Sequence, residues 1–254
     1  MGIRRQSLML VSLFGLSLAA NGAAGAPANE IEAGIAYDRL TNGLPEWWRE
    51  YLEALHRFDT RQLVYGGLQH AERFRRDDTE IYGGAYQPLG PATTVSGEAT
   101  AGATHDIFPE WSLFGQVAQT LPRGWGVQLG LRHRAYRGAT VDIGSLILER
   151  YWGAYRGAYT YALADLEGET AGSHRLQLNY YYGDRSTVGV SYATGRELES
   201  AGTPVVLIYD VTYYGLSGRH WLNDRWAMSY AVEVNEQGDS YRRMEFTLGV
   251  RRAF

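Results

Sequence analysis

A chain of 254 residues with 45% hydrophobic and 20% charged residues has the composition of a folded protein, which excludes a disordered chain. Its 24 basic residues, all arginine, nearly balance 28 acidic residues, so the charge balance offers no basic surface for nucleic acid. The absence of cysteine excludes disulfide scaffolds, thiolate metal sites and cysteine nucleophiles.

The first segment has the pattern of a secretory signal peptide. Arg4 and Arg5 precede an apolar stretch at 8–18, and small residues follow at 19–26. An uncleaved membrane anchor would need about 20 apolar residues, and this stretch is shorter. We therefore predict a signal peptide over 1–24, export, and a barrel domain over 25–254.

The exported chain shows no convincing helical period; apolar and polar side chains alternate instead in repeated short segments. Such alternation is typical of strands that have one apolar face. Fourteen segments are expected, at 30–40, 47–58, 62–74, 79–88, 92–103, 110–120, 124–135, 140–151, 154–165, 174–183, 186–196, 204–219, 225–236 and 240–254. Because 79–88 and 92–103 are weak, 12 strands remain an alternative.

The sizes of the side chains indicate which face of each strand is outside. In 124–135, Trp125, Val127 and Leu129 share one face, and small residues and arginines share the other. Small residues would cover little of a water-facing surface, but they suit a crowded interior, whereas large apolar and aromatic residues suit lipid. The sequence therefore predicts an all-β protein, a transmembrane antiparallel up-and-down β-barrel.

The connections are expected to alternate in length, with short turns in the periplasm and longer loops outside. Short turns are predicted at 59–60, 121–123, 183–185 and 222–224, and longer loops around 41–46, 74–79, 104–109, 165–173 and 197–203.

The last segment carries a further signal. Phe246, Leu248, Val250 and the terminal Phe254 share one face, and an aromatic last residue on such a strand is typical of chains that the outer-membrane assembly machinery recognises. Arg252 lies on this face too, where it is tolerable if its head reaches water near the interface.

Several stretches together resemble the YaiO family of outer-membrane β-barrels. They lie at 108–136, 149–153, 180–197, 216–221 and 238–241, and include Pro109-Glu110-Trp111 and Gly183-Asp184-Arg185-Ser186. The resemblance implies a barrel in the outer membrane of a Gram-negative cell envelope and an association with surface-glycan systems. It supplies no catalytic residue.

By alternation, charged side chains of both signs should project into the barrel. The candidate binding residues are Arg132, Arg134, Arg156, Arg175, Arg243, Arg251, Glu98, Glu197, Glu233 and Glu245; Glu32, Asp38 and Asp210 are expected on the same face. Paired charges of this kind either cross-link the wall and plug the interior or line a hydrophilic passage.

Catalysis and metal binding have weaker support. His133 is expected on the lipid face beside the segment that contains Ser145, but no spacing indicates a nucleophile and its base. His56 and His70 lie on neighbouring segments without a diagnostic ligand spacing. We expect no enzyme activity, no cofactor and no metal ion.

The leading hypothesis is a porin-like channel or transport protein for surface glycan or small hydrophilic solutes. A non-conducting structural or recognition barrel is the alternative, and a lipid-acting enzyme is third. The expected partners are outer-membrane lipid, the assembly machinery through Phe254 and surface-glycan export components, with no nucleic acid.

Overall fold

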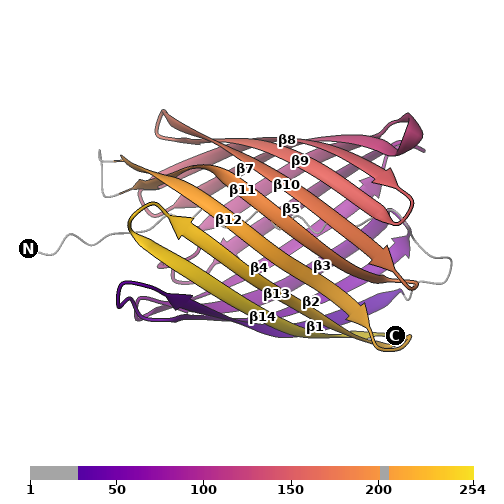
Figure 1. The fold of residues 1–254 in the computed structure, drawn as a ribbon, viewed down its shortest axis with the longest axis horizontal. Coiled ribbons are helices and arrows are strands. Elements are labelled where there is room, and N and C mark those ends of the chain that lie inside the picture. Colours follow the sequence, from indigo (N-terminus) through magenta and orange to yellow (C-terminus); the bar gives the residue numbers. More distant parts are fainter. Residues whose placement is uncertain (1–27, 201–205) are drawn as a thin grey trace, which may run out of the picture.

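The computed structural model describes residues 28–200 and 206–254. Fourteen antiparallel strands close into one barrel in which each strand pairs with its neighbours in sequence and β1 pairs with β14, as predicted (Figure 1). The strands are β1 (Asn29–Leu40), β2 (Trp47–Asp59), β3 (Gln62–Arg73), β4 (Arg76–Pro88), β5 (Thr93–Gly102), β6 (Trp111–Thr120), β7 (Trp125–Tyr136), β8 (Ala139–Trp152), β9 (Tyr155–Leu166), β10 (Glu169–Tyr182), β11 (Ser186–Ser200), β12 (Val206–Trp221), β13 (Trp226–Gln237) and β14 (Tyr241–Ala253). The predicted signal peptide lies outside the described residues.

A short 3-10 turn, η1 (Pro122–Gly124), precedes β7. Within the described ranges, no helix is long and apolar enough to cross a bilayer.

The seam between β1 and β14 brings the two ends of the described chain together. The backbone N–H of Phe254 donates to the carbonyl of Asn29 at 3.0 Å, and the N–H of Asn29 donates back at 3.3 Å. We call this end of the barrel the terminal end and the opposite one the loop end. The register of the seam places Glu32 opposite Arg251 and Asp38 opposite Glu245.

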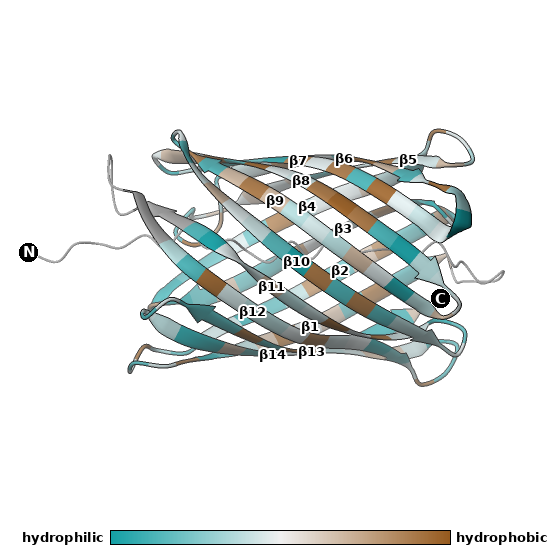
Figure 2. Ribbon diagram, turned by 45° about the horizontal axis from the view of Figure 1, so that its top comes forward, coloured by the Kyte–Doolittle hydropathy of each residue, from teal (hydrophilic) through white to brown (hydrophobic). Residues whose placement is uncertain are grey.

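Hydrophobic and hydrophilic residues alternate along the strands, as Figure 2 shows by colour. On β7, Leu129 and Leu131 are 62% and 74% exposed, whereas Arg134 on the opposite face is 8% exposed. Successive side chains of a strand point to opposite faces, so the apolar face is outside and the charged face is inside. This orientation is that of an outer-membrane barrel and the reverse of a soluble one.

Aromatic residues on the outer face gather near both ends of the strands. The terminal end carries Trp125, Trp152, Tyr155, Trp226 and Phe254, and the loop end carries Tyr37, Trp48 and Trp111. Arg252 lies 5.4 Å from the Trp226 ring centroid and Arg150 lies 5.2 Å from that of Trp125. Aromatic residues at both interfaces are typical of membrane barrels.

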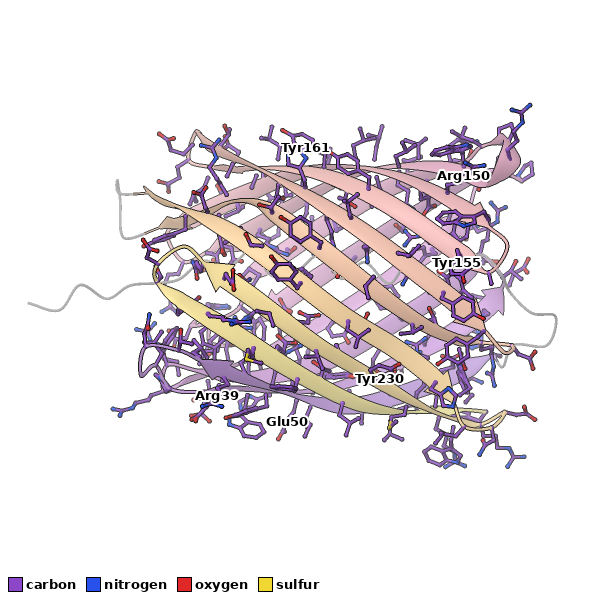
Figure 3. The ribbon with its side chains drawn as sticks, in the orientation of Figure 1. Arg39, Glu50, Arg150, Tyr155, Tyr161 and Tyr230 are labelled. Carbon is purple, nitrogen blue, oxygen red and sulfur yellow. The ribbon has the colours of Figure 1, made fainter. Side chains whose placement is uncertain are left out.

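At the loop end, charged residues lie beyond the belt of aromatic residues. Arg39 and Glu50 project outward there, and Arg150 and Tyr155 lie at the other end of the molecule (Figure 3). A bilayer needs about 9–11 residues of tilted strand, and β8, β10 and β12 have 14, 14 and 16 residues. The strands therefore extend beyond the hydrocarbon at the loop end.

Two connections differ from the predicted loop lengths. Phe74 and Arg75 form a two-residue turn between β3 and β4, and Glu167 and Gly168 form another between β9 and β10. All four residues have positive φ, which is the backbone geometry of tight hairpins. The predicted longer loops at 74–79 and 165–173 are thus wrong, while the connections 41–46 and 103–110 are long, as predicted. The predicted loop 197–203 is wrong in its first part, since residues 197–200 belong to β11, and its remaining residues lie outside the described residues.

The long connection 103–110 is anchored on one carboxylate. Asp78 of β4 is 1% exposed and accepts hydrogen bonds from the backbone N–H groups of Thr104, Ile107 and Phe108 at 2.9, 3.1 and 3.0 Å. It also accepts from the Thr104 hydroxyl at 2.8 Å. Because buried N–H groups need acceptors, Asp78 holds this loop against the rim of the barrel.

Candidate functional site

The structure places all ten candidate binding residues on the inner face of the barrel. Arg156, Glu233 and Arg251 are no more than 2% exposed. Asp210 is a correction: it lies directly across from Arg196, and both side chains are exposed on the outer face. Asp210 is near the loop end of β12, where the strands extend into water, so an outward charge costs little there.

Arg251 is the centre of a cluster at the terminal end of the seam. Its guanidinium contacts Glu30 at 2.6 Å, Glu53 at 3.2 Å and Glu32. Arg219 of β12 approaches Glu32 at 3.7 Å. Charge-assisted pairs of this kind are the strong hydrogen bonds of proteins, and here they join β14 to β1 and β2 across the closure.

A second cluster lies near the loop end of the same seam. Arg49 of β2 donates to Glu245 of β14 at 3.1 Å, and Arg243 lies 3.5 Å from Asp38 and 3.8 Å from Glu245. The buried ring of Trp47 contacts the Arg243 guanidinium, with a centroid distance of 5.6 Å. Both ends of the seam are therefore closed by arginine and carboxylate side chains.

The rest of the inner wall carries separate pairs. Arg132 donates to Glu98 at 3.1 Å, and Arg156 pairs with Glu149 at 2.7 Å. Arg175 lies 5.4 Å from the ring centroid of Tyr213. Each group thus faces a neighbour on an adjacent or nearby strand, which offsets the cost of removing its charge from bulk water.

A row of tyrosines covers the inner face of β2, β3 and β4. Tyr51, Tyr65 and Tyr82 donate hydrogen bonds from their hydroxyls to Glu32, Glu98 and Glu53, at 2.8, 2.6 and 3.3 Å. The Tyr65 ring centroid lies 6.4 Å from that of Tyr82 and 6.2 Å from that of Tyr86. We call these four residues the tyrosine wall.

Sequence reasoning missed several members of this surface. Glu30, Arg49, Glu53, Arg219 and the tyrosine wall were not among its candidates, although they have the same parity as inward residues on their own strands. That parity is the signal that would have found them. The tyrosines were missed because aromatic residues were assigned to lipid.

An apolar patch interrupts the polar wall at the loop end. Ile143, Ala162, Ala164, Leu166 and Ala171 pack together on the inner faces of β8, β9 and β10. This is a small cluster of mostly alanine side chains, so it covers one sector of the wall and leaves the polar sectors uncovered.

The histidine candidates lie away from this surface. His133 is on the outer face and contacts Asp142 at 2.7 Å, whereas Ser145 is across from Gly130, three residues along the strand. The two side chains are therefore on opposite faces and cannot form a nucleophile and base pair. Among the described residues, no group of three or more possible ligands gathers at one point to hold a metal ion.

A closed barrel with a lipid-facing outer surface and a charged interior defines an integral outer-membrane β-barrel protein. The chain belongs to the YaiO family: the model of the YaiO membrane beta barrel domain matches residues 28–200. No curated protein matches the chain.

Solved structures of outer-membrane proteins share the fold at low sequence identity. A bacterial polysaccharide outer membrane secretin is similar, with a TM-score of 0.61, 8% identity and coverage of 91% of this chain and 99% of that one. The CymD monoaromatic hydrocarbon channel is similar with a TM-score of 0.62 and 9% identity, over 91% of this chain and 89% of that one. The outer membrane protein Omp33 of Acinetobacter baumannii is similar with a TM-score of 0.54 and 10% identity, over 91% of this chain and 100% of that one.

Proposed function

We propose that this barrel is a channel that passes hydrophilic solutes through the outer membrane. The observation that carries the proposal is the arrangement of its inner charges along the wall. The ion pairs of the inner wall join strands that are at most three positions apart around the barrel, as in Arg219 of β12 with Glu32 of β1. Pairs of this reach follow the curved wall and do not join opposite sides of the barrel.

Partial exposure of the inner side chains supports access of water. The side chains of Arg132 and Glu98 are 13% and 20% exposed, and those of Arg49 and Arg219 are 29% and 27% exposed although both face inward. A barrel of 14 strands is wider than the eight-strand barrels that side chains fill and narrower than porins of 16–18 strands. A narrow, charged passage follows.

Substitution of the inner arginines is expected to change ion selectivity. In planar bilayers, the purified protein should open discrete channels, and Arg132→Glu and Arg134→Glu should each shift the reversal potential in a salt gradient toward cation preference, because a negative wall attracts cations. Arg150→Glu is the matched control, since Arg150 is outside. A folded protein that never conducts would overturn the proposal.

A non-conducting barrel is the second candidate. It is favoured by the burial of Arg156 and Arg251, which are 1% and 2% exposed inside ion pairs. Buried pairs cross-link a wall whether or not solute passes. The bilayer recording separates the two functions, because only the channel opens.

The setting of this function follows from the same reasoning. We propose export by cleavage of the signal peptide over 1–24, recognition of Phe254 by the assembly machinery, contact with outer-membrane lipid and association with surface-glycan export components. Phe254 is 58% exposed beside β1, which suits recognition before closure. The proposed role is not enzymatic, and the similarity of the barrel in fold to porins and channels supports this.

A further inference from the structure

We propose that the tyrosine wall binds neutral oligosaccharides inside the barrel. The proposal rests on the channel function above and adds the class of solute and the residues that contact it. Tyr51, Tyr65, Tyr82 and Tyr86 come from three adjacent strands and stay half-buried inside the barrel. Each offers a ring where most inner residues are small or charged.

Glycines on neighbouring strands make room for three of these rings. A Cβ added to Gly67 would meet the Tyr82 hydroxyl at 2.5 Å, one added to Gly84 would meet that of Tyr65 at 2.5 Å, and one added to Gly34 would meet the Tyr51 ring at 2.5 Å. The far end of each ring thus rests directly on backbone. The inner sides of these glycines are therefore occupied by the tyrosine hydroxyl ends.

Carboxylates fix the rings and complete the binding chemistry. The tyrosine hydroxyls donate to Glu32, Glu53 and Glu98, which orients each ring and leaves further lone pairs on the carboxylates. A sugar ring presents C–H groups on its faces and hydroxyl groups at its edges. Aromatic rings bordered by acceptors match both. The Tyr65 ring lies 6.4 Å from that of Tyr82 and 6.2 Å from that of Tyr86, at interplanar angles of 54° and 39°, so the rings form a continuous aromatic surface for a chain of sugar units.

The charges of this wall favour neutral over acidic sugars. Three carboxylates lie close to the tyrosines: Glu53 on β2, Glu80 on β4 and Glu98 on β5, the strand next to β4. Two of the arginines that reach these carboxylates, Arg251 and Arg132, are already held in ion pairs with Glu53 and Glu98. A carboxylate on the sugar would meet the negative charge of these three glutamates, which is unfavourable.

Binding is tested on the purified, detergent-solubilised barrel by calorimetry. The probes are pentasaccharides of glucose, N-acetylglucosamine and mannose, with pentagalacturonate as the acidic probe. We expect at least one neutral probe to bind at least tenfold more tightly than pentagalacturonate. Tyr65→Ala and Tyr82→Ala should each weaken it by about tenfold, and Tyr65→Phe by threefold or less, because the ring face is kept.

The control is Tyr161→Ala, which removes a tyrosine from the outer face. Tyr161 also covers a glycine, since a Cβ added to Gly172 would lie 3.3 Å from the Tyr161 hydroxyl. It should leave sugar affinity unchanged, and a heat-dependent shift on gels confirms that every variant is folded. The proposal is overturned if no neutral probe binds, or if affinity survives in folded Tyr65→Ala and Tyr82→Ala. Calorimetry needs no ion current, so a silent bilayer with intact sugar binding would refute the channel alone.

Discussion

Replacement of Arg251 by alanine is expected to lower the free energy of unfolding of the barrel by about 3–5 kcal/mol, since removing one partner of a buried ion pair leaves uncompensated charge. Arg251 holds Glu30, Glu32 and Glu53 and is 2% exposed, so that three carboxylates lose their common cation. Urea unfolding in detergent micelles, followed by tryptophan fluorescence, measures the loss.

Arg252→Ala is the matched control, because it removes the next arginine in the chain from the outer face. Arg252 is exposed and lies against Trp226, so its removal is expected to cost less than about 1 kcal/mol. Equal losses for the two variants would show that the cluster at the seam does not hold the closure.

Replacement of Asp78 by alanine is expected to release the loop 103–110 from the rim. The backbone N–H groups of Ile107 and Phe108 both donate to Asp78, and each hydrogen bond to a charged group contributes about 1.5–3 kcal/mol. Amide hydrogen exchange in this loop should therefore become at least about 100-fold faster, since 1.4 kcal/mol corresponds to a factor of ten. Mass spectrometry of loop peptides measures the exchange.

Asp77→Ala serves as the control for this loop. Asp77 is adjacent in sequence but its side chain is exposed, and we expect loop exchange within about threefold of the unmodified protein because no buried donor loses its acceptor. If the Asp78 variant also kept its slow exchange, the carboxylate would not be the anchor.

The strand pattern could be predicted because lipid and water enforce the alternation residue by residue. Trp226, Met228 and Val232 of β13 face outward while Ala227 and Glu233 are buried, as the sequence indicated. The assignment of charged residues to the inner face fails for Asp210, because the outer face at the loop end of the strands is in water and accepts charge. Alternation therefore predicts orientation within the membrane and loses force beyond it.

The turns and the partners of the inner wall could not be predicted from local sequence. Phe74 and Arg75 form a tight turn with positive φ, but neither residue type is a turn signal, since such turns usually carry Asn or Gly. The contact of Arg251 with Glu53 depends on two strand registers, because β1 lies between the strands that carry them. A single sequence shows which residues are charged, but without the strand register it does not show which of them pair.

The position of the arginine clusters makes barrel closure conditional on the strand that is synthesised last. Until β14 docks, Glu30, Glu32 and Asp38 on the first strand lack Arg251 and Arg243, so an open barrel keeps uncompensated negative charge on the inner face of that edge. Docking neutralises that edge and seals it in one event. The stabilisation from these ion pairs is therefore gained only by a chain that carries its last strand.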